Sequence, residues 1–87
     1  MSYPTILANI PNAVAEAVDD ERGRQLRKFG NQLHKSNDLW ALILAEEFGE
    51  VCKDILDGRN VRTELVQLAA VAIAWIEAVD ARQEVID

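Results

Sequence analysis

The sequence predicts an all-α protein, and three observations support this fold class. Both prolines, Pro4 and Pro11, lie near the N-terminus, so no proline interrupts a helix anywhere in residues 12–87. Apolar residues recur at spacings of three and four, which is the period of an amphipathic helix. Apolar residues make up 49% of the 87 residues and aromatic residues only 6%, a composition that suits one helical domain.

The first part of the chain is predicted to be an irregular arm followed by one helix. Residues 1–11 contain both prolines and are expected to form the arm. Asn12 is a suitable N-cap residue, so the first helix is predicted over residues 13–28. Gly30 and Asn31 follow it and provide a signal for its end.

Two further helices are predicted after a polar connection over residues 30–37. A cap among residues 36–38 begins the second helix, which runs to about Leu56. The Asp-Gly-Arg-Asn turn at residues 57–60 separates it from the third helix, which Asn60 caps. The third helix is expected to continue to about Arg82 or beyond, and the whole chain of residues 1–87 forms one domain.

The third predicted helix is apolar on all sides. From Leu65 to Val79 only Gln67 and Glu77 are polar, and such a helix is buried on most sides. Two other helices of a short chain can hardly cover it. We therefore expect antiparallel helices that assemble with a partner subunit into a four-helix-bundle-type oligomer, with a compact three-helix monomer as the alternative.

The charge and the single cysteine exclude several classes of function. Fifteen acidic residues against nine basic ones give a net charge of −6, which argues against a nucleic-acid or anionic-membrane surface. The longest apolar run, residues 68–76, is far shorter than the ~20 residues that span a bilayer. Cys52 alone forms no internal disulfide, which fits a reducing cytoplasm, and no second cysteine or histidine stands at the spacing of a zinc site.

Two acidic clusters on neighbouring helices are the most informative feature. Glu46, Glu47 and Glu50 lie on the second predicted helix, and Glu64 precedes Gln67 by three residues on the third. Like charges at these spacings repel, so folding alone does not favour them. A hard divalent cation such as Mg²⁺ prefers carboxylate oxygens and removes the conflict. The pattern therefore predicts a metal site.

Two tryptophans share the faces that carry these acids. At about 100° per residue, Trp40 lies within about 20° of Glu47, and Trp75 within about 20° of Glu64. The short turn makes the two helices antiparallel, so both indoles fall at the same end of the pair. A stacking surface beside a metal suits a nucleoside triphosphate. The alternative is that the tryptophans are core residues and the acidic faces are solvated.

Three polar residues nearby are weaker candidates for binding a nucleotide. Gln32 and His34 lie in the polar connection, where His34 could contact a base or a phosphate or be an ordinary exposed side chain. Lys53 could contact phosphates, although exposed cations are common on helices. No glycine-rich phosphate loop is present, so any phosphate contact depends on these side chains and on a cation.

Taken together, these motifs resemble the signature of a known family. Glu46-Glu47-x-x-Glu50, followed after thirteen residues by Glu64-x-x-Gln67, resembles the pattern of the MazG-like all-α nucleoside triphosphate pyrophosphohydrolases. The segments at residues 28–34 and 64–75 are also similar to one MazG-like branch. The resemblance covers roughly residues 21–80.

The resemblance implies a helical homodimer or homotetramer that cleaves a nucleoside or deoxynucleoside triphosphate into monophosphate and pyrophosphate. It implies that Mg²⁺, or Mn²⁺ in its place, is held by Glu47, Glu50, Glu64 and the position of Gln67. It implies that Glu46 helps to bind a further metal or orients the attacking water, and we expect Glu46 or Glu50 to position that water. Gln67 departs from the family's aspartate, and its amide oxygen can bind a cation but adds no charge. The alternatives are a non-catalytic nucleotide- or metal-binding protein and a purely structural helical oligomer.

Overall fold

The computed structural model describes residues 9–86, with side chains described to Arg82, and contains three helices and no strand within this part of the chain. They are α2 (Asn12–Phe29), α3 (Asn37–Leu56) and α4 (Arg62–Ile86). The all-α prediction is confirmed. Residues 1–8 of the expected arm lie outside the described residues, and residues 9–11 are irregular.

The helix ends of α3 and α4 follow from local side-chain chemistry. The Ser36 hydroxyl accepts a hydrogen bond from Leu39 N at 3.3 Å and caps α3. Gly58 adopts a φ of 72°, which an L-residue rarely reaches, and so permits the turn after α3. Asn60 Oδ1 accepts from Arg62 N at 2.8 Å at the start of α4. The cap predicted at residues 36–38 is therefore confirmed. The cap predicted at Asn60 is wrong by one residue, because Val61 precedes α4 and its carbonyl accepts from Leu65 N at 2.9 Å, while Asn60 satisfies the Arg62 N–H from the position before it.

The predicted cap of the first helix is wrong by one residue. α2 begins at Asn12 itself, and Pro11 occupies the N-cap position. The Pro11 carbonyl accepts hydrogen bonds from Val14 N at 3.0 Å and Ala15 N at 3.1 Å, so backbone rather than the Asn12 side chain closes the first turn. At the other end, Gly30 has a φ of 72° and donates its N–H to Leu26 O, which ends the helix where the sequence predicted.

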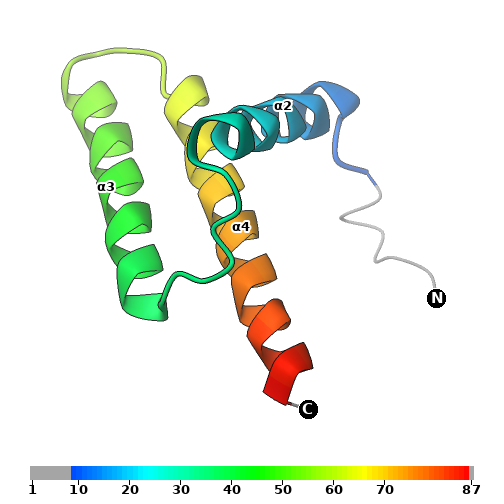
Figure 1. Cartoon of the computed structure of the whole chain (residues 1–87). Coiled ribbons are helices and arrows are strands. Elements are labelled where there is room, and N and C mark those ends of the chain that lie inside the picture. The colour runs from blue at the N-terminus through cyan, green and yellow to red at the C-terminus, as the bar shows by residue number, and fades with distance from the viewer. Residues whose placement is uncertain (1–8, 87) are drawn as a thin grey trace.

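The three helices are arranged around α4, which packs against both α2 and α3 (Figure 1). α3 and α4 run side by side and antiparallel, and α2 crosses α4. The described residues that are buried are Trp40 and Val51 of α3 and Ala70, Val71 and Ala78 of α4, and Trp40, Val71 and Ala78 form one cluster between the two helices. α2 contributes no buried residue, so its position depends on partly buried contacts. None of the described helices is long and apolar enough to cross a membrane.

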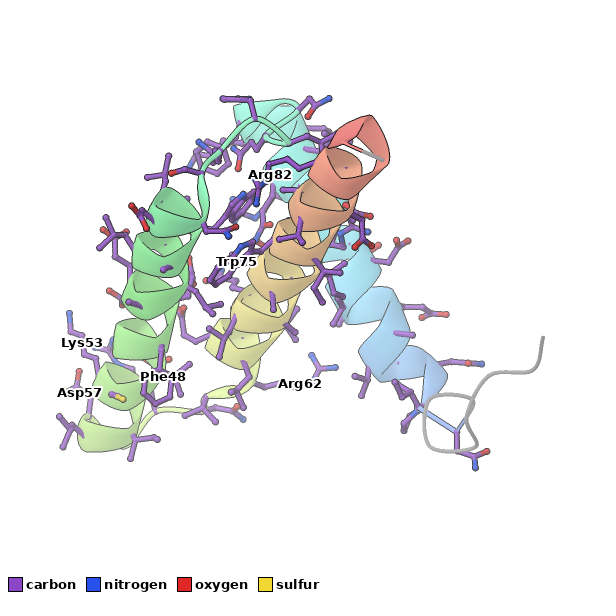
Figure 2. The ribbon with its side chains drawn as sticks, turned by 90° about the horizontal axis from the view of Figure 1, so that it is seen from below. Phe48, Lys53, Asp57, Arg62, Trp75 and Arg82 are labelled. Carbon is purple, nitrogen blue, oxygen red and sulfur yellow. The ribbon has the colours of Figure 1, made fainter. Side chains whose placement is uncertain are left out.

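Asn37 joins the start of α3 to the later part of α4. Its Oδ1 accepts hydrogen bonds from Trp75 Nε1 at 2.9 Å and from Arg82 Nη2 at 2.5 Å. Arg82 Nη1 also donates to the Lys35 carbonyl at 2.8 Å. Figure 2 shows Trp75 between α3 and α4. These bonds fasten the connection between α2 and α3 to α4, and they place Trp75 at the same end of the helix pair as Trp40.

One side of the α3–α4 pair is apolar and exposed. Phe48 and Ile55 on α3 are 56% and 63% exposed, and Leu65 and Ile76 on α4 are 45% and 59% exposed. Phe48 and Ile55 lie about 80–100° around α3 from Glu47, and Leu65 and Ile76 lie about 100–120° around α4 from Glu64. Because the helices are antiparallel, these directions fall on the same side. Ala70, on the other side of α4, is completely buried. We call these four residues the apolar face.

Candidate functional site

Three of the four predicted metal ligands meet between α3 and α4. The Gln67 amide is oriented so that its Nε2 donates to Glu64 Oε2 at 2.8 Å and to Glu47 Oε2 at 3.3 Å, since the reverse orientation would set its oxygen against two acceptors. Glu47 comes from α3, and Glu64 and Gln67 come from α4. The fold therefore brings acids from neighbouring helices to one amide, as the sequence predicted.

The Glu47 carboxylate carries an incompletely compensated negative charge. Its pKa is raised first by burial, and then by the charges of Glu64, Glu21 and Glu50, while Arg24 opposes the rise. A carboxylate in this environment is stabilised by an added positive charge. The raised pKa of Glu47 means that its charged form is disfavoured in this environment, a cost that a proton or a cation would relieve.

The other acids of the first motif are more open to solvent. Glu46 and Glu50 are exposed, with Glu50 one turn along α3 from Glu47. Within residues 9–82, no three acidic, histidine or cysteine side chains form a ready-made metal-ligand group. The donors nevertheless fit a hard cation in their chemistry, because two carboxylates and an amide converge and Glu50 is adjacent.

α2 adds three residues to this region that the sequence did not single out. The Glu21 side chain is only 11% exposed. Its carboxylate accepts two hydrogen bonds from Arg24, one from Nε at 2.8 Å and one from Nη2 at 2.7 Å. Gln25 Nε2 donates to the same carboxylate at 2.9 Å. The signal available in the sequence was that Glu21 precedes Arg24 by three residues and Gln25 by four, a spacing at which side chains on one helix face can contact each other. It is common on exposed helices and does not reveal that α2 crosses beside the acids.

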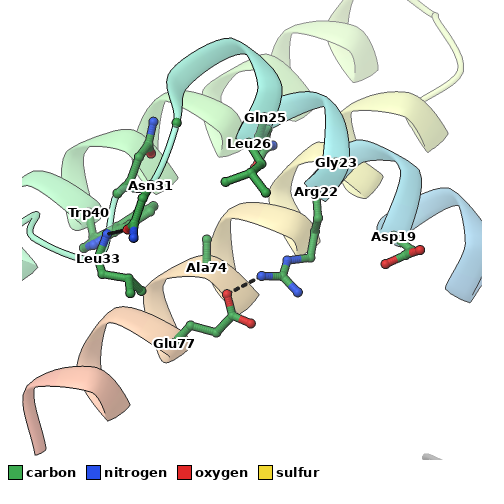
Figure 3. Close-up of a pocket in the computed structure, with 12 residues that line it drawn as sticks. Asp19, Arg22, Gly23, Gln25, Leu26, Asn31, Leu33, Trp40, Ala74 and Glu77 are labelled. Atoms are coloured by element: carbon green, nitrogen blue, oxygen red, sulfur yellow. Dashed lines mark hydrogen bonds and ion pairs between the residues drawn. The ribbon is translucent and has the colours of Figure 1, made fainter.

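A cavity of about 480 Å³ lies beside α2, within the size range of small-molecule sites (Figure 3). Its walls come from α2, from the connection that follows it, from Trp40 of α3, and from α4. Arg22 and Glu77, which both line it, form an ion pair between α2 and α4. Gln25 also lines the cavity while it donates to Glu21. The cavity and the acidic region therefore share α2.

The predicted substrate-binding residues divide into two groups. Trp40 and Gln32 line the cavity. Trp75 is partly buried and donates its N–H to Asn37, while His34 and Lys53 are exposed, with Lys53 pointing away from α4 (Figure 2). None of these three residues lines the cavity.

Trp40 is both a core residue and a wall of the cavity. Its side chain is 2% exposed and packs with Val71 and Ala78. Its buried Nε1 has no hydrogen-bond partner among the described residues. The interpretation of Trp40 as a core residue is therefore confirmed, while its part in binding a nucleotide stays a prediction that its position in the cavity wall permits.

Comparisons of the chain with protein-family models, with curated proteins and with solved structures find no match. The MazG-like resemblance of the two acidic motifs therefore stays a prediction. Evidence for a function comes from the geometry and the charges of the acidic region and of the cavity.

Proposed function

We propose that this protein is a Mg²⁺-dependent nucleoside or deoxynucleoside triphosphate pyrophosphohydrolase that releases a monophosphate and pyrophosphate. The observation that carries the proposal is the convergence of Glu47 and Glu64 on Gln67, from two helices. Gln67 donates a hydrogen bond to each acid, but the two carboxylates still repel each other, and a bound cation would remove that repulsion. The resemblance of the two motifs to the MazG-like signature assigns the same residues to the metal.

Four residues are proposed to hold the cation: Glu47, Glu50, Glu64 and Gln67. Bound Mg²⁺ supplies charge neutralisation for the phosphates and lowers the pKa of a bound water. Gln67 now presents its Nε2 to both carboxylates. To act as a ligand it turns its amide so that Oε1 faces the cation, because only the oxygen carries lone pairs for a metal.

The remaining residues are assigned to water and to the nucleoside. Glu46 and Glu50 are exposed carboxylates on either side of Glu47 along α3, so each can accept a hydrogen bond from the attacking water and orient it. The cavity beside α2 is proposed to hold the nucleoside, with the Trp40 ring and the Gln32 amide in its wall. Gln25 lines this cavity and contacts the acidic region, which supports one continuous site.

The test of this activity is a substrate panel. The pure protein is incubated with nucleoside and deoxynucleoside triphosphates and Mg²⁺, and pyrophosphate is measured. Glu47→Ala and Glu50→Ala are expected to abolish the product. Glu16→Ala removes an exposed acid of α2 and serves as the matched control. Unchanged turnover in both site variants would contradict the proposal.

The active form is proposed to be a homodimer or homotetramer that buries the apolar face. Phe48, Ile55, Leu65 and Ile76 lie on one side of α3 and α4, so a second copy can complete a four-helix bundle there. Light scattering after gel filtration tests this. Ile76→Glu is expected to give monomers, whereas Leu56→Glu, which is 85% exposed but outside the face, stays oligomeric. A monomeric wild type would contradict the proposal.

A second candidate function is nucleotide or cation binding without turnover. Gln67 favours it, because an amide gives the site one negative charge fewer than the aspartate of the related motif. Binding of a triphosphate without release of pyrophosphate would identify this function. A purely structural oligomer would instead show a melting temperature that does not respond to Mg²⁺.

A further inference from the structure

The connection between α2 and α3, residues 30–36, forms one wall of the cavity. Gly30, Asn31, Gln32 and Leu33 all line it. Within the described residues α2 packs against α4 but not against α3, so the connection is the segment that spans from one to the other beside the cavity. The shape of the cavity therefore depends on where this connection is held.

The hydrogen bonds inside the connection are local. Leu33 N donates to Asn31 Oδ1 at 2.8 Å, and Lys35 N donates to the Gln32 carbonyl at 3.2 Å. These bonds shape the turns of the connection but do not tie it to another helix. Leu33 is its one large apolar residue and is 40% exposed. Burial of apolar surface therefore supplies little to hold the connection in place.

Arg82 ties the connection to α4 (Figure 2). Its Nη1 donates to the Lys35 carbonyl at 2.8 Å, and its Nη2 donates to Asn37 Oδ1 at 2.5 Å, where the connection enters α3. The same Asn37 oxygen accepts from Trp75 Nε1 at 2.9 Å. Among the described residues, no other hydrogen bond joins the connection or Asn37 to α4. We call Asn37, Trp75 and Arg82 the clasp.

From this arrangement we infer that Arg82 and Asn37 are positioning residues for the cavity, which fix its wall at residues 30–33 without contacting the ligand. The inference rests on the proposed function, because it takes a nucleoside as the occupant of the cavity. It deepens that function by naming the groups that set the affinity for the nucleoside. The three clasp residues do not line the cavity. A wall that is already held needs no ordering when a ligand binds, so the clasp raises the affinity through preorganisation.

A purely structural clasp makes a different prediction. If the clasp only stabilises the fold, its loss lowers the melting temperature and leaves the affinity of the folded protein for a nucleoside unchanged. If it positions the wall, its loss lowers that affinity as well, because the cavity then has its binding shape in only a fraction of the molecules. Affinities measured well below the melting temperature of each variant separate the two roles.

The experiment is an NMR titration of the full chain, without Mg²⁺, with adenosine, guanosine, cytidine, uridine and thymidine. The side-chain N–H signals of Gln32 and Trp40 report binding in the cavity, and the indole N–H signal of Trp75 reports the clasp. Arg82→Gln is expected to shift the Trp75 signal and to weaken the tightest-binding nucleoside roughly 2- to 10-fold, the range for one typical hydrogen bond. Arg59→Gln, an exposed arginine beyond the opposite end of α3, is the matched control and keeps the wild-type affinity.

Variants of Asn37 test the clasp from its other side. Asn37→Ala removes the oxygen that Trp75 and Arg82 share, so the affinity for the nucleoside falls as it does in Arg82→Gln. Asn37→Asp keeps an oxygen there, adds a charge that attracts the guanidinium, and suits the first turn of a helix. It is expected to bind the nucleoside at least as tightly as wild type. Wild-type affinity in both Arg82→Gln and Asn37→Ala would overturn the inference.

The outcomes distinguish this inference from the proposed function. If wild-type protein releases pyrophosphate but binds no nucleoside in the cavity, or binds it no more tightly than the clasp variants do, the inference is overturned and the hydrolase proposal stands. If wild-type protein neither binds a nucleoside nor releases pyrophosphate, both are overturned. If it binds a nucleoside without turnover and Arg82→Gln and Asn37→Ala bind it more weakly, the inference stands for a nucleoside-binding protein.

Discussion

Glu47→Gln is expected to stabilise the metal-free protein and to remove its response to Mg²⁺. Oxygens of Glu47 and Glu64 lie 3.3 and 2.8 Å from the same Gln67 nitrogen, so these two oxygens are roughly 6 Å apart or less. Two unit charges at that separation repel by about 0.7 kcal/mol in water and by about 3 kcal/mol at an effective dielectric constant of 20. Because Glu47 is partly exposed, solvent screens the repulsion, and its energy lies toward the lower of these two values. We therefore expect Glu47→Gln to raise the free energy of unfolding by about 1 kcal/mol.

The substitution is well matched because a glutamine at position 47 keeps an oxygen that can accept from Gln67 Nε2. For a domain of this size, about 1 kcal/mol raises the melting temperature by roughly 4–8 °C. The assay is thermal unfolding followed by circular dichroism, in EDTA and in millimolar Mg²⁺, at one protein concentration. Glu16→Gln, an exposed acid on α2, controls for the change in net charge.

Two results would refute this reasoning. A Glu47→Gln variant that melts at or below the wild-type temperature in EDTA would mean that the carboxylate is not in conflict with its neighbours. A variant that keeps the full wild-type shift in Mg²⁺ would mean that Glu47 does not contact the cation.

Three further predictions follow from the same geometry. The pKa of Glu47 is raised and that of Glu21 is lowered, the latter chiefly by the Arg24 hydrogen bond. As the pH falls from neutral toward the ordinary value of 4.5, protonation of Glu47 should relieve its cost and raise the stability of the metal-free protein. Below that value, protonation of Glu21 should lower the stability. Urea unfolding at a series of pH values measures both effects, and the Glu47→Gln variant should show only the loss at low pH. Gln67→Glu should bind Mg²⁺ more tightly by calorimetry but melt at a lower temperature in EDTA, because it adds a third charge and removes the bridging N–H groups. Ala78→Leu, at a completely buried position, should cost about 1–3 kcal/mol by overpacking in urea unfolding, and a neutral result would mean that the core has unused space.

Features fixed by short stretches of sequence could be predicted. Ser36 and the two glycines at positions 30 and 58 set the helix ends through their own hydrogen bonds and φ angles. Glu47 and Glu64 meet because a five-residue connection makes their helices antiparallel neighbours, and helix periodicity then determines which faces meet. This part of the site needed no knowledge of the rest of the fold.

Features that depend on how α2 crosses α4 could not be predicted. The connection over residues 30–36 does not fix a crossing direction by its sequence, and α2 has no buried residue whose spacing would indicate its partner. Glu21 and Arg24 therefore resembled an ordinary exposed ion pair. Nor did the sequence indicate that the Trp75 N–H is used by Asn37.

The hydrogen bonds of Asn37 tie the start of α3 to the later turns of α4. The first turns of this helix carry Glu64 and Gln67, and its later turns hold the connection that borders the cavity, through Trp75 and Arg82. A rigid rod that shifts at one end also shifts at the other. If the proposed cation and a ligand in the cavity both bind, α4 contacts both sites, and any factor by which one changes the affinity of the other must act equally in the reverse direction.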